Sequence, residues 1–207
     1  MIILAIDTTS EFGSLALRAD GATVQEVALR SNTGYGHLIL PAIEKLLNEA
    51  NLRLSDIDCF AAASGPGSFT GVRVGLGTTK GLAEAMGKPA IGISNLRAVA
   101  SFGKKGLRGI LLDARRGDVY AAIYNQRLEL VSPETVAKPA EWTAGPGREA
   151  EEFVSQKAGP EADSFRNLAA AVALCAELDR EHWSDPAALD ANYVRRSDAE
   201  HAWTELS

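Results

Sequence analysis

A run of turn-forming residues between two apolar segments constrains the fold of this chain more than any other feature. Residues 65–68 read Gly-Pro-Gly-Ser; they follow the apolar run 59–63 and precede a segment with the composition of a helix up to about Met86. Dense turn formers at this place predict a strand, a tight turn and a helix, in that order. This order is typical of α/β folds, in which the helix covers the sheet that its strand enters.

The turn has two interpretations, which the sequence leaves open. Backbone N–H groups at a helix N-terminus attract anions, so the turn either binds a phosphate or is purely structural and uses glycine for positive φ. The spacing is that of neither a P-loop nor the dinucleotide pattern G-x-G-x-x-G, and the shape of the turn favours the structural interpretation. Both interpretations concern Gly65, Pro66, Gly67, Ser68, Thr70 and Arg73.

The helix after the turn contains glycine at positions 75, 77 and 81. Each glycine costs a helix about 0.5–1 kcal/mol relative to alanine, so another interaction must offset the loss. Small residues form one stripe along this helix and bulkier residues form a second. The small-residue stripe consists of Val74, Gly77, Thr78, Gly81 and Ala85. Two apolar sides predict that the helix packs on its own sheet and on a second helix, within the domain or in another chain.

A second helix, predicted over residues 37–50, has a similar surplus of apolar surface. Pro41 is compatible with it because proline is tolerated in the first turn of a helix. One apolar line runs along this helix, and Leu40 and Leu47 make it wider than a single sheet face requires. The line itself consists of Ile39, Ile43, Leu46 and Ala50.

Composition places the chain among ordinary globular proteins and argues against some functions. Its 207 residues are 46% hydrophobic and 23% charged, enough for one large domain or two small lobes. A net charge of −6 argues against broad, unassisted binding to nucleic acid. Cys59 and Cys175 lie in no zinc or redox spacing and are expected to be buried thiols of a reducing compartment. The N-terminal residues have neither a signal-peptide pattern nor a membrane-spanning run, so the expected location is the cytoplasm.

The order of the predicted elements indicates the fold. Strands are predicted at residues 2–6, 14–19, 23–29, 59–63 and 90–93. Helices are predicted at 37–50, from the glycine turn to about Met86, and from Asn95 to about Phe102. The resulting order βββαβαβα resembles the ribonuclease-H-like unit of the actin, hexokinase and Hsp70 superfamily. We therefore expect an α/β, two-lobed fold of this kind, with mixed central sheets flanked by helices.

The second half of the chain predicts a smaller lobe of the same superfamily. Strands are expected at residues 110–112 and 119–124, with a further one at 127–131, and a helix at 168–178. Residues 132–164 are rich in proline and glycine, which interrupt helices and strands, so irregular structure with a short helix is predicted there. The expected division is an N-terminal lobe of residues 1–104, which carries the partner-binding helices, and a C-terminal lobe of residues 105–207.

Few residues qualify for catalysis. Asp7, followed by Thr8 and Thr9, either faces a magnesium ion, as superfamily members do, or forms an Asx-turn. Asp113 either is the second superfamily carboxylate or forms a solvated turn with Arg115, and the turn is favoured. No histidines have metal-ligand spacing, Ser68 lacks the G-x-S-x-G elbow, and His37 suits a cap or partner contact better than catalysis.

Several blocks of sequence together resemble the TsaB (YeaZ) family. They are residues 3–8 (ILAIDT), His37 with Leu40 and Pro41, residues 65–75 (GPGSFTGVRVG), residues 89–94 (PAIGIS), residues 113–120 (DARRGDVY) and the tail residues Tyr193, Val194 and Arg195. The middle of the second lobe matches loosely. The tail departs from the family at Ala191, where many relatives have proline.

The resemblance implies a non-catalytic subunit of the bacterial machinery that makes threonylcarbamoyladenosine (t6A) beside the anticodon of tRNAs reading ANN codons. Such subunits pair with the paralogue TsaD, which holds the metal and performs the transfer, and the ATPase TsaE joins them. The paralogue's H-x-x-x-H corresponds here to Asn95 and Val99, which predicts no metal site. The resemblance also implies no tightly bound cofactor, with ATP or ADP at most at the complex interface, tRNA contact only through the complex, and no membrane.

The resemblance also assigns the partner-binding surface to the two helices, and the same surface is expected to form a homodimer when TsaD is absent. The interface residues it implies are His37, Leu40, Pro41, Ile43 and Leu47 on the first helix, and Val74, Gly77, Thr78, Gly81 and Ala85 on the second. The alternative hypotheses are an ATP-binding kinase or ATPase that uses Asp7 and the glycine turn, and a peptidase, for which no nucleophile and base are evident.

Overall fold

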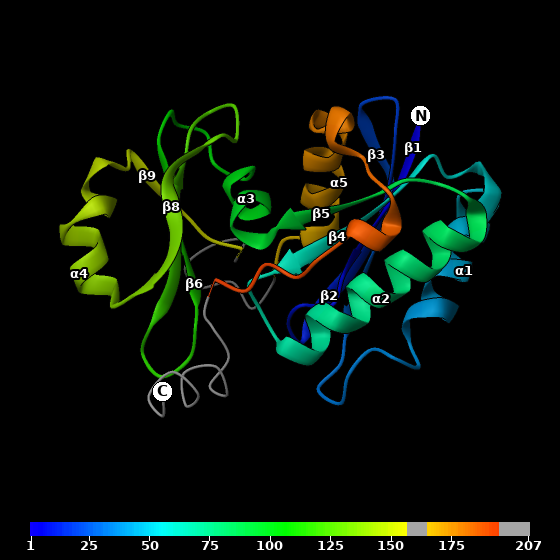
Figure 1. Ribbon diagram of the computed structural model, residues 1–207, viewed down its shortest axis with the longest axis horizontal. Coiled ribbons are helices and arrows are strands. Elements are labelled where there is room, and N and C mark those ends of the chain that lie inside the picture. The colour runs from blue at the N-terminus through cyan, green and yellow to red at the C-terminus, as the bar shows by residue number, and fades with distance from the viewer. Residues whose placement is uncertain (157–164, 195–207) are drawn as a thin grey trace.

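The computed structural model describes residues 1–156 and 165–194, which form two sheets with helices packed on and between them (Figure 1). The N-terminal sheet has the strand order β3-β2-β1-β4-β5, and the second has the order β8-β7-β6-β9. The predicted two-lobed α/β fold is therefore confirmed.

The N-terminal sheet combines an antiparallel meander with two parallel strands. Strands β1 (Ile2–Asp7), β2 (Phe12–Ala19) and β3 (Ala22–Arg30) pair antiparallel. Strand β4 (Cys59–Gly65) lies parallel to β1, and β5 (Ala90–Ser94) lies parallel to β4. The carboxyl ends of β1, β4 and β5 consequently meet at one edge of the sheet, where α/β proteins usually place their ligands.

Helices cover both faces of this sheet. Helices α1 (Ile39–Glu49) and α2 (Phe69–Met86) share an apolar core with Leu4 and Ile6 of β1. Helices α3 (Asn95–Ala100) and α5 (Leu168–Leu178) share a core with the alternate residues of β1, Ile3 and Ala5. Successive residues of a strand point to opposite faces, and both faces are covered here, which fits the unbroken apolar run of β1 from Ile2 to Ile6.

The second sheet is smaller and belongs to the other lobe. Strands β6 (Arg108–Asp113), β7 (Val119–Tyr124) and β8 (Leu130–Ala137) pair antiparallel, and β9 (Glu152–Val154) pairs parallel to β6. A short helix, α4 (Pro139–Ala144), follows β8. The remaining helical turns are η1 (Leu54–Asp56), η2 (Pro146–Glu149), η3 (Arg180–His182) and η4 (Pro186–Ala188).

The prediction of irregular structure after residue 131 was partly wrong. The strand expected at residues 127–131 begins only at Leu130 and continues to Ala137, and β9 was not predicted. Pro133 obscured β8, but β8 is an edge strand, where proline is tolerated. The register of β8 against β7 shifts around this proline. The predicted short helix is present as α4, and residues 157–164 lie outside the described part.

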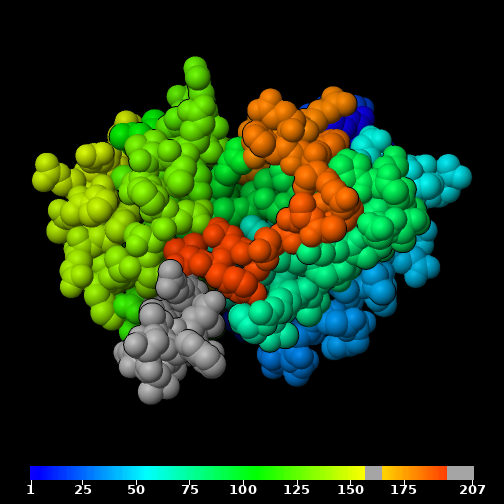
Figure 2. Space-filling view, in the orientation of Figure 1, coloured from blue at the N-terminus to red at the C-terminus, as the bar shows by residue number. Residues whose placement is uncertain are grey.

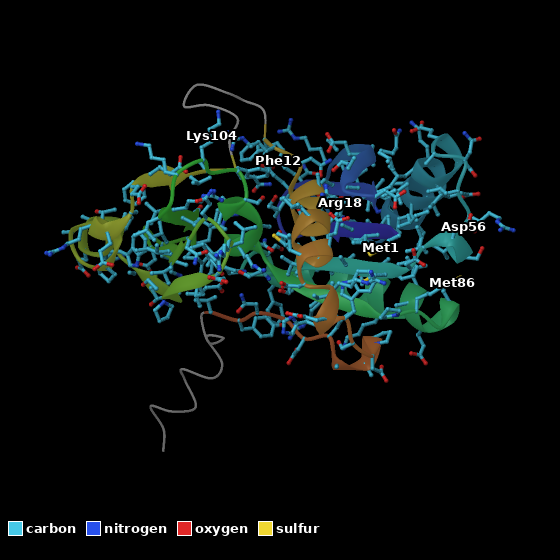
Figure 3. The ribbon with its side chains drawn as sticks, turned by 90° about the horizontal axis from the view of Figure 1, so that it is seen from above. Met1, Phe12, Arg18, Asp56, Met86 and Lys104 are labelled. Atoms are coloured by element: carbon cyan, nitrogen blue, oxygen red, sulfur yellow. The ribbon has the colours of Figure 1, made fainter. Side chains whose placement is uncertain are left out.

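The predicted division after residue 104 separates the two sheets, but the second segment also returns to the first. Helix α5 packs against β1 and β2, and Nε of Arg18 on β2 donates a 2.7 Å hydrogen bond to Glu177 of α5 (Figure 3). One apolar core connects α3, α5 and both sheets. The lobes therefore share structure, because the N-terminal sheet needs a helix from the second segment to cover its other face.

Two further features follow from burial. Cys59 and Cys175 are buried free thiols, as predicted, and burial raises the pKa of each to about 12. Among the helices of residues 1–156 and 165–194, none combines the length and hydrophobicity needed to cross a membrane.

Candidate functional site

The glycine turn between β4 and α2 packs directly against the turn that follows β1. A Cβ atom added at Gly67 would lie 2.6 Å from the carbonyl oxygen of Thr9, and one at Gly71 would lie 2.0 Å from that of Thr8. A Cβ at Gly75 would lie 2.7 Å from Oγ1 of Thr8. Gly67 and Gly71 are therefore required because two backbone segments of the same chain approach closely, whereas Gly75 leaves room for the Thr8 side chain.

Hydrogen bonds close the contact between the two turns. The Ser68 amide donates to the carbonyl oxygen of Thr9 at 2.7 Å, and Oγ1 of Thr8 donates to the carbonyl oxygen of Gly71, also at 2.7 Å. Ser68 is the N-cap of α2, and its Oγ accepts a hydrogen bond from the Gly71 amide at 3.3 Å. Thr8 and Thr9 thus occupy the space beside the turn, and this geometry supports the structural interpretation.

Asn95 connects this contact to β5. Its Nδ2 donates to Oγ1 of Thr9 at 2.7 Å and to the carbonyl oxygen of Pro66 at 3.1 Å, and its Oδ1 accepts from the Gly65 amide at 3.2 Å. Only 4% of Asn95 is exposed, and Val99 lies in the core. In the sequence, Asn95 was notable only because it stands where the paralogue has a metal-binding histidine. Its hydrogen bonds to Thr9, Gly65 and Pro66 are seen only in the tertiary structure.

Asp7 is fully buried at the end of β1. Its Oδ1 accepts hydrogen bonds from the Thr9 amide at 2.9 Å and from Oγ1 of Thr9 at 2.6 Å, which is the Asx-turn considered above. Its Oδ2 has no hydrogen-bond partner within the described residues. Burial raises the pKa of Asp7 to about 6, against the lowering effect of the two hydrogen bonds.

Metal ligands are not gathered around Asp7. Across residues 1–156 and 165–194, no three His, Cys, Asp or Glu side chains are grouped so that they could hold a metal ion. His201 lies outside the described residues.

Asp113 and Arg115 form an exposed turn on the other lobe, between β6 and β7. The Arg115 amide donates to Oδ1 of Asp113 at 2.7 Å, and the two side chains are 3.8 Å apart at their closest charged atoms. Arg115 has a φ of 65°, as tight turns often require. Asp113 therefore belongs to a solvated turn, the favoured interpretation, and it does not join Asp7 in one site.

A polar cluster that the sequence did not predict joins the two lobes. Glu134 of β8 accepts hydrogen bonds from Oγ of Ser94 at the end of β5, from the hydroxyl of Tyr124 at 2.6 Å and from Nδ2 of Asn192 at 2.6 Å. Burial raises the pKa of Tyr124, and the nearby Glu134 carboxylate adds to the effect. The residues of this polar cluster come from four separate segments of the chain, so no local sequence pattern could have indicated the cluster.

The segment that carries Asn192 crosses between the lobes. Residues 184–194 run along the surface of α2 and then reach the second lobe, as the orange-to-red path in Figure 2 shows. The Asn192 amide donates to the carbonyl oxygen of Ser64 at 2.8 Å, and Leu189 is buried in the core beneath α2. We refer to residues 184–194 as the crossing segment. Arg195, the last residue of the family-like tail, lies outside the described part.

The outer face of α2 carries the predicted small-residue stripe. Gly77, Gly81 and Ala85 are exposed, and Val74 and Thr78 are half-buried. A Cβ atom added at Gly77 or Gly81 would meet no atom within 4 Å. Unlike Gly67, Gly71 and Gly75, these two glycines are not required by any contact among the described residues.

On α1 the structure separates the predicted interface residues into two groups. His37, Leu40 and Pro41 are exposed, with Leu40 exposed by 55%. Ile43 and Leu47 are only 3% and 6% exposed, because they pack into the core between α1 and the sheet. Ile43 and Leu47 therefore belong to the core of the chain itself. The predicted interface residues that are exposed are Leu40 and Pro41 of α1 and His37, which precedes α1.

The remaining residues of the glycine stretch face different surroundings. Pro66 is buried, whereas Thr70 and Arg73 are exposed. The guanidinium carbon of Arg73 lies 3.4 Å from the centre of the Phe69 ring. Arg73 thus points away from the β1 turn and towards the surface.

Comparison with known proteins identifies the family. Residues 31–201 match the family model described as "TsaD: tRNA N6-adenosine threonylcarbamoyltransferase". A relative in Escherichia coli (strain K12), "tRNA threonylcarbamoyladenosine biosynthesis protein TsaB", is 42% identical over 132 residues, which are 61% of this chain and 56% of the relative. The protein of the same description in Bacillus subtilis (strain 168) is 35% identical over 147 residues, 69% of this chain and 64% of the relative. The chain thus spans between about half and two thirds of these curated relatives.

A solved structure agrees with the sequence relatives. The protein described as "YeaZ from Pseudomonas aeruginosa" superposes with a TM-score of 0.74 at 25% identity, covering 93% of this chain and 99% of that one. Sequence matches and backbone similarity therefore point to the same group of proteins. The chain belongs to the TsaB (YeaZ) family, within the wider family described by the TsaD model.

Proposed function

We propose that this chain is a non-catalytic subunit in the synthesis of t6A in tRNAs that read ANN codons, and that it acts by binding a TsaD-like paralogue through the outer faces of α1 and α2. The names of the relatives supply the pathway. A TsaE-like ATPase, tRNA held through the complex, ATP or ADP at the complex interface and a cytoplasmic location complete the proposal. The same surface forms a homodimer when the paralogue is absent.

The observation that carries this proposal is the unfilled space over Gly77 and Gly81. Each glycine costs α2 about 0.5–1 kcal/mol relative to alanine, and no contact among the described residues requires it. A second helix packed on this face would explain the cost, because small residues let two helix backbones approach closely. The exposed side chains of Leu40 on α1 and Phe69 on α2 would add buried area to such an interface. A stable interface of this kind covers about 800 Å² on each partner.

The non-catalytic role is supported by the filled edge of the N-terminal sheet. Thr8 and Thr9 occupy the space beside the glycine turn, and Asn95 uses both its amide nitrogen and its oxygen on protein groups. The rival hypothesis of an ATPase needs room for phosphates beside Gly67, where the Thr9 carbonyl oxygen already lies. Calorimetry of the isolated chain with Mg-ATP tests the rival, which predicts submillimolar binding with turnover.

The binding proposal is tested with substitutions on α2. In sedimentation experiments with the purified TsaD-like paralogue, Gly77→Arg and Gly81→Arg should abolish complex formation, because a long charged side chain would occupy the face where the partner helix packs. Both variants should stay folded, since position 77 and position 81 face open space. Circular dichroism checks the fold.

Two variants serve as controls. Ala140→Arg adds the same side chain on the exposed surface of α4 and should bind like the wild type. Gly77→Ala adds only a methyl group, so it tests the effect of helix propensity separately from the effect of a large side chain. If Gly77→Arg bound the paralogue as tightly as the wild type, the interface would be wrong. If the isolated chain modified tRNA unaided, the non-catalytic role would be wrong.

A further inference from the structure

Two exposed aromatic rings lie close to the guanidinium of Arg73 near the N-terminal end of α2. Its Cζ lies 3.4 Å from the centre of the Phe69 ring and 5.8 Å from that of Tyr193. The two rings are 5.8 Å apart between centres. Phe69 precedes Arg73 by one helical turn, and Tyr193 arrives from the crossing segment. We call these three residues the arginine cluster.

Exposing these two rings to water is unfavourable in free energy, which favours their burial in an assembly. Phe69 is 51% exposed and Tyr193 is 46% exposed, and both are large apolar side chains on adjoining surface. Contiguous exposed aromatic groups mark interaction sites more often than isolated ones do. Arginine and tyrosine are also enriched among the residues that dominate binding energies at protein interfaces.

The guanidinium has unused hydrogen-bonding capacity. Within residues 1–156 and 165–194, the guanidinium lies close to the two aromatic rings, and no carboxylate or carbonyl oxygen accepts a hydrogen bond from it. A guanidinium carries five N–H donors in a planar fork that matches an oxyanion in bidentate geometry. Stacking on the Phe69 ring restricts the plane of that fork, so less side-chain freedom is lost on binding.

The surroundings favour a single carboxylate over the phosphates of a nucleic acid. Lys80, the next basic residue along α2, donates to the carbonyl oxygen of Ala187. Asp190 lies on the crossing segment, and Glu134 binds the residue before Tyr193. A nucleic-acid backbone is bound by several cations together, and the chain as a whole carries a net charge of −6. A single arginine that is stacked on one aromatic ring and lies near a second instead suits one acidic side chain of a protein.

We propose that the arginine cluster is a pre-positioned anchor for one aspartate or glutamate of the protein that covers the outer face of α2. This inference rests on the function proposed above, and it extends the binding surface to the N-terminal end of α2 and to the crossing segment. Arg73 precedes Gly77 of the small-residue stripe by four residues of α2, about one helical turn, so the two lie on the same side and one partner can cover both. The crossing segment thereby takes part in binding, through Tyr193.

The test is the dissociation constant of the complex with the TsaD-like paralogue, measured by calorimetry. Arg73→Gln should raise it about 10- to 100-fold, the usual effect of losing an interface anchor. Arg73→Lys should fall between Gln and the wild type, because an ammonium cannot form the planar bidentate pair. Tyr193→Phe keeps the ring and should bind like the wild type, whereas Tyr193→Ala should weaken binding. Arg127→Gln, an exposed arginine of the other lobe, is the matched control and should have no effect.

The outcomes separate this inference from the proposed function. If Arg73→Gln binds the paralogue like the wild type while Gly77→Arg does not, the anchor is wrong and the helix interface stands. If the wild-type chain does not bind the paralogue at all, the proposed function fails, and the anchor with it. If Arg73→Gln weakens only the binding of tRNA to the complex, the guanidinium serves a phosphate and the carboxylate anchor is wrong. Equal melting temperatures for all variants verify that folding is unaffected.

Discussion

Asn95 donates a hydrogen bond from Nδ2 to Oγ1 of Thr9 at 2.7 Å, across 86 residues of sequence. Together with the Gly65 amide, which donates to Oδ1 of the same side chain, this bond ties the ends of β1, β4 and β5. Ligands of α/β proteins usually bind at such an edge. Here Asn95, Thr9 and Gly65 form hydrogen bonds with one another, which supports the proposal of a non-catalytic subunit.

Removing the Asn95 side chain should destabilise the fold. In Asn95→Ala, the buried Gly65 amide loses its acceptor and Thr9 loses a donor, so the free energy of unfolding should fall by about 2–3 kcal/mol. Urea denaturation measures the change. The exposed Asn48→Ala, on α1, is the control and should change stability by no more than about 0.5 kcal/mol. Equal losses in the two variants would contradict the assigned role of Asn95.

The same substitution at two glycines of α2 should have opposite effects. Gly71→Ala would place a Cβ 2.0 Å from the Thr8 carbonyl oxygen, so the backbones must separate and stability should fall by at least about 1–3 kcal/mol. Gly77→Ala adds a Cβ into open space and should raise stability by about 0.5–1 kcal/mol, through helix propensity. Thermal unfolding of both variants measures the difference. A destabilised Gly77→Ala would mean that the free chain already packs on this face.

Asp7 should make stability depend on pH between about 4 and 6. Its pKa is 3.8 in an unperturbed carboxyl and about 6 in the folded chain, so in this range the folded state keeps a proton that the unfolded state has lost. Stability contributed by Asp7 therefore falls as pH rises through this window, and above it the full cost, about 3 kcal/mol, is present.

Asp7→Asn isolates this effect. Asparagine keeps the Oδ1 acceptor for Thr9 but cannot ionise, so its stability relative to the wild type should improve by about 2–3 kcal/mol between pH 4 and pH 7. Guanidinium unfolding at a series of pH values gives the two curves. Parallel curves over the whole range would show that the Asp7 carboxylate is not held in a desolvated site.

Glu134 should hold the crossing segment in place. Glu134→Gln replaces one accepting oxygen with an amide donor, although Ser94, Tyr124 and Asn192 all donate to this side chain. We expect a loss of about 1–3 kcal/mol and faster hydrogen exchange at the Asn192 amide, which is bonded to Ser64. Glu141→Gln on the exposed face of α4 is the control. Unchanged hydrogen exchange at the Asn192 amide in Glu134→Gln would show that Glu134 does not hold the crossing segment in place.

Local patterns determined much of the fold. The meander, the strand before the glycine turn and helix α2 follow from apolar runs, turn formers and helical periodicity, which act over a few neighbouring residues. The exposed small-residue stripe at Gly77 and Gly81 was predicted for the same reason, since helical spacing alone places these residues on one side. The Asx-turn at Asp7 is likewise a local preference.

The tertiary structure decided what these elements contact. Sequence could not distinguish Gly71, which lies against Thr8, from Gly77, which faces open space, because the two differ only in distant neighbours. For the same reason Ile43 was expected on the interface and lies in the core. The partners of Glu134 lie 10, 40 and 58 residues away from it in the sequence, and Tyr193 joins Phe69 and Arg73 from the crossing segment. Long-range packing fixes such contacts, and no short-range pattern records them.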